Sequence, residues 1–153
     1  MKIAAARSVE RLRGLGPKRI GIVSARFYED LADQLEDGAA RALDAGGIRS
    51  ENRRVVHVPG CFELPLACRK LIDAGMDAVV ALGVVIRGET PHFDFVAGEC
   101  ARGLMDVQLT TGVPIGFGVL TTETLAQAQE RADPARGDKG FEAAVAALSL
   151  LLI

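Results

Sequence analysis

Residues 78–86 form an unbroken apolar run that constrains the fold more than any other feature of this chain. Such a run is typical of a central parallel strand that is covered on both faces. It passes directly into a polar loop, residues 87–92, which reads Arg-Gly-Glu-Thr-Pro-His. Because open α/β sheets bind ligands where their strands end, this loop is the first candidate for a functional site.

Strand-like apolar segments alternate with amphipathic helical segments along the chain. Strands are predicted at residues 19–25, 55–58, 78–86 and 114–120, and helices at residues 29–45, 63–74, 93–109, 124–132 and 139–153. This alternation predicts a single α/β domain with a four-stranded parallel sheet and right-handed crossovers. Residues 1–18 fit no element of this sheet, and we expect them to be mobile or to pair with a neighbouring subunit.

Length and composition argue against several classes of function. The 153 residues suffice for one hydrophobic core, and a net charge of −2 does not favour nucleic-acid binding. Cys61, Cys68 and Cys100 lack the spacing of a zinc site or of a disulfide framework, which predicts reduced thiols, a cytoplasmic protein and no metal. We expect no signal peptide, because residues 1–13 lack a long apolar segment, and no membrane span, because the apolar run of residues 143–153 is short.

Three loops with distinctive chemistry follow the first three predicted strands, and in a parallel sheet they lie at one edge. Phe27 offers an aromatic face for a planar ligand, and Glu63 can accept hydrogen bonds from hydroxyl or amine groups. Backbone N–H groups at residues 88–90 precede a helix and therefore suit a phosphate. His92 supplies an imidazole, the side chain that most often moves protons in enzymes.

Each of these residues also has an ordinary structural interpretation. A phenylalanine after a strand packs into the core more often than it holds a ligand, and Glu63 suits the first turn of a helix. His92 fits a helix cap equally well, while Arg131 near a helix end and Lys139 between glycines are common features. The residues alone indicate a phosphate-containing ligand at an α/β sheet edge.

Four segments resemble the motifs of one enzyme family. Residues 59–65 resemble its Pro-Gly-x-aromatic-Glu-x-Pro turn, and residues 86–94, Ile-Arg-Gly-Glu-Thr-Pro-His-Phe-Asp, are similar to its central signature. Residues 117–122 and 137–140 are similar to its later blocks. The family is lumazine synthase (6,7-dimethyl-8-ribityllumazine synthase), and the resemblance runs from about residue 20 to residue 150.

This resemblance implies a flavodoxin-like three-layer α/β/α sandwich over residues 19–153. The implied reaction belongs to riboflavin biosynthesis and condenses 5-amino-6-ribitylaminouracil with 3,4-dihydroxy-2-butanone 4-phosphate. It needs no metal and no organic cofactor. The implied partners are identical subunits, arranged in a pentamer or in an icosahedral shell of sixty subunits.

The resemblance also implies roles for the residues that would hold the pyrimidine. Phe27 would stack on its ring, and His92 would carry protons during the reaction. The residues that would hold the ring and the ribityl chain are Cys61, Phe62, Glu63, Val84, Val85 and Ile86.

A second set of residues would hold the butanone phosphate or come from another subunit. Glu89 and Thr90 would bind this substrate, with Arg131 paired to its phosphate group. The residues implied to come from a neighbouring subunit are Phe117, Arg131 and Lys139. Tyr28 and Asp138 stand where asparagine is common in the family, which affects ring contacts and loop charge.

Two other functions fit the same motifs less well. A non-catalytic relative that binds flavin or lumazine, or that forms cages, is disfavoured because His92, Arg131 and Lys139 are all present. A riboflavin synthase of the archaeal type is disfavoured because that type lacks the full Arg-Gly-x-Thr-Pro-His signature. The enzyme of the lumazine synthase reaction is therefore the first hypothesis.

Overall fold

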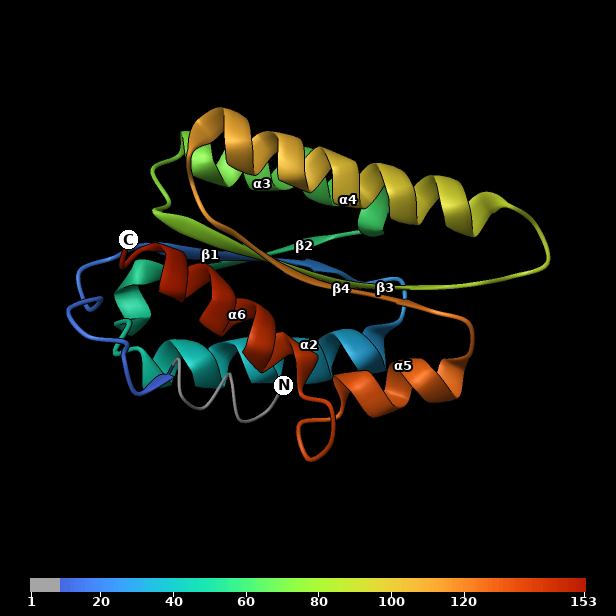
Figure 1. Ribbon diagram of the computed structural model, residues 1–153, viewed down its shortest axis with the longest axis horizontal. Coiled ribbons are helices and arrows are strands. Elements are labelled where there is room, and N and C mark those ends of the chain that lie inside the picture. Colours follow the sequence, from blue (N-terminus) through green and yellow to red (C-terminus); the bar gives the residue numbers. More distant parts are fainter. Residues whose placement is uncertain (1–8) are drawn as a thin grey trace.

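The chain folds into three layers, shown in Figure 1 as a computed structural model that describes residues 9–153. A parallel sheet forms the middle layer, with the strand order β2-β1-β3-β4. Its strands are β1 (Ile20–Ala25), β2 (Arg53–Val58), β3 (Ala78–Ile86) and β4 (Ile115–Thr122). The predicted α/β class and the four-stranded parallel sheet are confirmed.

Helices cover both faces of the sheet (Figure 1). The helices on one face are α3 (Leu64–Asp73) and α4 (His92–Thr111). The helices on the other face are α2 (Glu29–Ala45), α5 (Leu125–Ala132) and α6 (Lys139–Leu150). Two short 3₁₀ helices, η1 (Ser50–Asn52) and η2 (Cys61–Glu63), flank β2. The result is the flavodoxin-like three-layer sandwich that the sequence predicts.

Strand β3 lies between β1 and β4 and forms the centre of the core. Val79, Val80, Ala81 and Leu82 are all fully buried. Val80 and Leu82 belong to the core on the side of α2 and α6, whereas Val79 and Ala81 belong to the core on the side of α3 and α4. Since side chains alternate across a strand, burial on both faces requires an apolar residue at every position.

The observed elements differ from the predicted ones mainly at their ends. Strand β2 begins at Arg53, two residues before the predicted start, because an edge strand can carry arginines on its solvent side. The helix predicted from residue 63 begins at Leu64 as α3, and Glu63 belongs to the preceding 3₁₀ turn η2. Helix α4 extends beyond residues 93–109 at both ends, and α6 ends at Leu150 instead of residue 153.

Helices α2 and α6 approach so closely that two glycines are required at their contact. A Cβ atom at Gly38 would lie 2.7 Å from the backbone nitrogen of Phe141, and one at Gly140 would collide with the backbone of Leu35. This approach fixes the first turn of α6 against α2. It therefore also fixes the backbone of Lys139, the first residue of α6.

Residues 9–18 lead into β1 and add to the core on the α2 side of the sheet. Leu12 and Leu15 are buried there. Residues 1–8 lie outside the described part of the chain, so the expectation that residues 1–18 are mobile or pair with another subunit stays a prediction. Among residues 9–153, no helix combines the length and the apolar character needed to cross a membrane.

Candidate active site

A cavity of about 540 Å³ opens where β1, β2 and β3 end, and we call it the strand-end cavity. The residues that line it are Phe27, Tyr28, Gly60, Cys61, Phe62, Glu63, Val84, Val85, Ile86, His92, Phe95 and Val96. They come from the segments that follow β1 and β2, from the end of β3 and from the first turns of α4. The parallel sheet thus brings together residues that are far apart in the sequence.

Phe27 lies at the mouth of this cavity and is 74% exposed, which excludes a core position. Its ring packs edge-on against Tyr28, with 5.0 Å between ring centroids and an interplanar angle of 67°. Tyr28 is partly buried against the hydrophobic core. The Phe27 ring is therefore held beside Tyr28 and stays mostly exposed, so it can serve as a platform for a planar ligand.

The turn after β2 forms one wall of the strand-end cavity. The Gly60 N–H donates a hydrogen bond of 2.9 Å to Oε1 of Glu63, so this carboxylate stabilises the turn. Cys61 approaches β3 at Gly83, where an added Cβ atom would lie only 2.5 Å from the Cys61 Sγ. The missing side chain at Gly83 allows η2 to pack against β3, so that Cys61 and the end of β3 line the same cavity.

The Cys61 thiol in this wall is unsuited to nucleophilic chemistry. The hydrogen bond with Cys100, followed by burial, raises the pKa of the Cys61 thiol. Cys61 is 5% exposed and lines the cavity, while Cys68 and Cys100 lie deeper in the same core. Because a thiolate is the reactive form of cysteine, Cys61 contributes shape and not a nucleophile.

His92 is the first residue of α4 and lines the cavity opposite the η2 turn. Its backbone N–H donates a hydrogen bond of 3.4 Å to Oγ1 of Thr90, which closes the loop before the helix. Glu89 and Thr90 are exposed on this loop and do not themselves line the cavity. The N-terminus of α4 therefore places His92 at the cavity, and the exposed residues Glu89 and Thr90 lie just before it in the sequence.

A second cavity of about 430 Å³ is lined by residues of β4, α5 and α6, and we call it the β4-edge cavity. Phe117, Arg131 and Lys139 line it together with Glu142. Nζ of Lys139 lies 2.8 Å from Oε2 of Glu142, and Nη1 of Arg131 donates to the Gln127 carbonyl oxygen at 3.3 Å. Two cations therefore share this cavity with one carboxylate.

The candidate site residues thus fall into two groups within one chain. Phe27, Glu63 and His92 line the strand-end cavity, whereas Arg131 and Lys139 line the β4-edge cavity. No residue contributes to both of these cavities. His92 and Arg131 therefore line different cavities of the same chain.

The sequence model of 6,7-dimethyl-8-ribityllumazine synthase matches residues 17–153, which include all the residues that line the two cavities. The chain belongs to the lumazine synthase family. The match covers both cavities, so they are parts of one family domain.

Curated members of the lumazine synthase family are similar over nearly the whole chain. The 6,7-dimethyl-8-ribityllumazine synthase of Halorhodospira halophila is 47% identical over 92% of this chain and 91% of its own length. The corresponding enzyme of Kineococcus radiotolerans is 53% identical over 88% of this chain and 83% of its own length. That of Edwardsiella ictaluri is 53% identical over 87% of this chain and 86% of its own length.

The lumazine synthase signature at residues 86–94 covers the end of β3, the following loop and the first turn of α4. Sequence reasoning missed Phe95 and Val96, which also line the strand-end cavity. They follow His92 at helical spacings of three and four, so an earlier helix start would have placed them on the same face. Within residues 9–153, no group of three or more acidic, cysteine or histidine side chains is arranged to hold a metal ion.

Proposed function

We propose that this chain condenses 5-amino-6-ribitylaminouracil with 3,4-dihydroxy-2-butanone 4-phosphate to give 6,7-dimethyl-8-ribityllumazine, phosphate and water. The observation that carries this proposal is the strand-end cavity, in which the exposed ring of Phe27 lies together with residues of the signature segments 59–65 and 86–94, among them His92. Both substrates are small molecules, and the residues described below supply the chemistry without a cofactor.

The pyrimidine occupies the strand-end cavity in this proposal. Its ring stacks on the exposed face of Phe27, which Tyr28 supports from the side. The ring and the ribityl chain lie along the cavity wall formed by Cys61, Phe62, Glu63, Val84, Val85 and Ile86. This wall is mainly apolar, so the few polar groups in it decide the orientation of the ligand.

His92 moves the protons of the reaction. The amine attacks the ketone, the adduct loses water to an imine, phosphate is eliminated, and the ribitylamino nitrogen closes the second ring on the remaining carbonyl with loss of a second water. Each of these steps transfers a proton, and imidazole changes its charge near neutral pH. A positioned general acid or base of this kind typically contributes about 10²- to 10⁴-fold in rate. Holding the two reactants side by side contributes further.

The phosphate of the second substrate binds between Thr90 and Arg131, with Glu89 next to the butanone. Arg131 offers a planar guanidinium with parallel donors, which matches phosphate oxygens. In a single chain Arg131 belongs to the β4-edge cavity and His92 to the strand-end cavity. The complete site therefore needs the strand-end cavity of one subunit and Phe117, Arg131 and Lys139 from the next.

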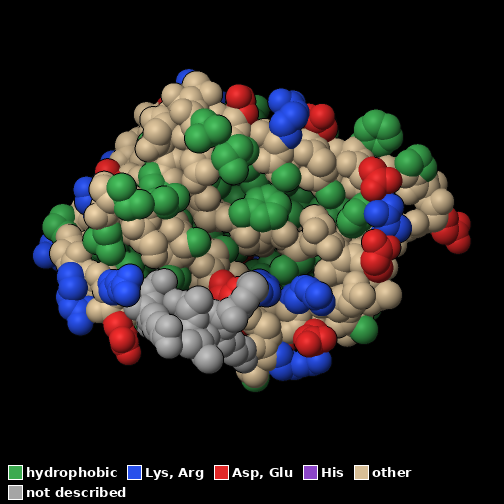
Figure 2. Space-filling model, in the orientation of Figure 1, with side chains coloured by type: hydrophobic (Ala, Val, Ile, Leu, Met, Phe, Trp, Pro, Cys, Tyr) green, Lys and Arg blue, Asp and Glu red, His purple; other side chains and the backbone are tan. Residues whose placement is uncertain are grey.

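An apolar surface next to the β4-edge cavity supports this assembly. Figure 2 shows hydrophobic side chains spread over the face that carries α4, β4 and α6. Met105 is 52% exposed, Leu109 is 75% exposed and Phe117 is 48% exposed, and Met105 and Phe117 line a groove between α4 and β4. Apolar surfaces of this kind usually mark interfaces.

Such a contact joins two different surfaces of identical subunits, so it closes only in a ring. The proposed ring is a pentamer, alone or as part of a shell of sixty subunits. The three free and buried thiols suit the reducing cytoplasm, where we place the protein.

The experiment for this function is direct. The purified protein is incubated with both substrates, and formation of the lumazine is followed by its fluorescence against an enzyme-free reaction. We expect a rate well above the spontaneous one and release of one phosphate for each lumazine. A protein that binds the pyrimidine but does not exceed the spontaneous rate would instead be a non-catalytic binding protein.

A further inference from the structure

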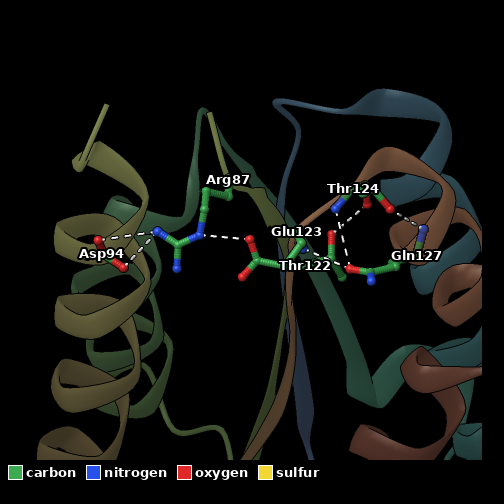
Figure 3. Close-up of polar contacts among 6 residues, drawn as sticks. All are labelled: Arg87, Asp94, Thr122, Glu123, Thr124 and Gln127. Atoms are coloured by element: carbon green, nitrogen blue, oxygen red, sulfur yellow. Dashed lines mark hydrogen bonds and ion pairs between the residues drawn. The ribbon is translucent and has the colours of Figure 1, made fainter. Parts of the chain in front are cut away.

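The side chain of Arg87 links the turn after β4 to the first turn of α4. Arg87 is the first residue after β3, and its Nε donates a hydrogen bond of 2.8 Å to Oε2 of Glu123, directly after β4. Its Nη1 lies 3.2 Å from Oδ1 of Asp94 in the first turn of α4. Figure 3 shows the guanidinium between these two carboxylates.

The β4 side of this bridge is held in place by its own hydrogen bonds (Figure 3). The Arg87 N–H donates to the Thr122 carbonyl oxygen at 2.9 Å, and the Glu123 N–H donates to Oε1 of Gln127 at 2.8 Å. Thr124 and Gln127 form a capping box at the start of α5. Glu123 therefore stands on a turn with a fixed backbone, which makes its carboxylate a firm partner for Arg87.

The other side of the bridge reaches the residues that follow His92. Asp94 lies two positions after it, and the Cζ of Arg87 lies 4.3 Å from the ring centroid of Phe93, the next residue. The loop between them is loosely packed, since a Cβ atom added at Gly88 would meet no atom within 4 Å. In addition to the hydrogen bonds of this loop, the start of α4 is therefore held by the side chain of Arg87.

Arg87 is absent from the lining of the strand-end cavity, and its guanidinium is engaged by the carboxylates of Glu123 and Asp94. Its ion pairs also add little to global stability. The side chains of Asp94 and Glu123 are 59% and 61% exposed, and such exposed pairs contribute little or nothing to the free energy of unfolding. The two ion pairs can instead restrict the position of the first turn of α4 relative to the turn after β4.

We infer that Arg87 is a positioning residue that places the imidazole of His92 by holding the first turn of α4 against the β4–α5 turn. The inference rests on the proposed function, in which His92 carries the protons. A catalytic group that is displaced by about 1 Å can lose about 10²-fold in rate. Loss of the bridge should therefore lower kcat and leave pyrimidine binding, which depends on Phe27, nearly unchanged.

The test combines kinetics with a double-mutant cycle. Arg87→Gln and Glu123→Gln are each expected to lower kcat by about tenfold, within the range that a misplaced group costs, with little change in KM for the pyrimidine. Because both variants break the same bridge, the double variant should be little slower than either single one. Arg102→Gln is the matched control, since Arg102 also forms an exposed ion pair on α4, with Glu99 at 2.6 Å, and should keep the wild-type kcat.

A second readout does not depend on turnover. Hydrogen exchange, measured by mass spectrometry on the assembled protein, should be faster in the first turn of α4 in Arg87→Gln and unchanged there in Arg102→Gln. A wild-type kcat in Arg87→Gln, additive effects in the double variant, or unchanged exchange would each overturn the inference. If the wild-type protein makes no lumazine, the proposed function fails, while the exchange still shows whether Arg87 holds α4.

Discussion

Arg41 and Asp138 lie 97 residues apart in the sequence and form a two-pronged ion pair. The Nη2 of Arg41 donates to Oδ1 of Asp138 at 2.6 Å and Nη1 donates to Oδ2 at 3.2 Å. Asp138 has a left-handed φ of 51° and directly precedes Lys139. The pair therefore ties α2 to the N-cap of α6. Lys139, which follows Asp138 and begins α6, lines the β4-edge cavity.

Asp138→Ala should destabilise the protein more than Asp138→Gly. Both variants lose the ion pair, but alanine must also adopt the left-handed backbone, which costs about 1–2 kcal/mol for a residue with a Cβ atom. Glycine adopts it without this cost. Denaturant unfolding of the two variants gives the difference in free energy directly. Equal stability of the two variants would show that the backbone at residue 138 is not strained.

His92→Ala should lower kcat more than it changes KM for either substrate. The expected loss is about 10²- to 10⁴-fold, the typical contribution of a general acid or base, with the spontaneous reaction as the floor. The measurement is the lumazine rate from pH 6 to pH 8. His57→Ala is the control, because His57 lies in β2 and pairs with Glu36 at 2.8 Å, away from the cavity lining. A wild-type rate for His92→Ala would remove it from the mechanism.

Arg131→Ala should raise KM for the butanone phosphate and leave KM for the pyrimidine unchanged. Loss of a hydrogen bond to a charged group costs about 1.5–3 kcal/mol, which corresponds to roughly 10- to 100-fold in affinity. Steady-state kinetics with each substrate varied in turn separates the two effects. Arg136→Ala is the control, since Arg136 pairs with Glu130 at 3.5 Å and does not line the β4-edge cavity. Equal effects on both substrates would contradict the phosphate role.

The stability of the protein should fall as the pH rises above about 8.5. Burial raises the pKa of the Cys68 thiol to about 12, so the folded protein keeps this proton. The unfolded chain releases it near pH 8.5, the ordinary pKa of cysteine. Its contribution is therefore complete below that pH and declines as the pH rises toward 12. Thermal unfolding from pH 8 to pH 11 measures the decline, and Cys68→Ala should make it shallower. An unchanged slope would assign the decline to other groups.

The elements that the sequence predicts well are those whose pattern is local. The apolar run of β3 is visible because both of its faces are buried, and the capping box of Thr124 and Gln127 is visible as a spacing. The start of β2 is invisible for the opposite reason. Arg53 and Arg54 look like loop residues until the sheet order places β2 at an edge.

The candidate site is only partly predictable for a related physical reason. The loops at the ends of β1, β2 and β3 meet because parallel strands end at one edge, which is a topological rule. The exposure of Phe27 and the bridge from Arg87 to Glu123 depend on side-chain packing between distant segments, which a pattern does not encode. The pattern of residues also does not encode the placement of His92 and Arg131 in different cavities, although the family resemblance implies that Arg131 comes from a neighbouring subunit.

The central claim is that one active site combines the strand-end cavity of one subunit with the β4-edge cavity of the next. Phe27→Asp and Arg131→Ala each damage one of these cavities, and both side chains are exposed, so both variants should fold. With the butanone phosphate held well below its KM, each variant alone should have only a small fraction of the wild-type rate. When the two are unfolded and reassembled together in equal amounts, about one quarter of the contacts between subunits in a closed ring should pair two intact cavities.

The decisive measurement is the lumazine rate of this mixed assembly, compared with each variant reassembled by itself, with native mass spectrometry to show that mixed rings have formed. The account predicts recovery of about one quarter of the wild-type rate, in proportion to the intact pairs in a closed ring. Mixed rings with no more activity than the separate variants would contradict it.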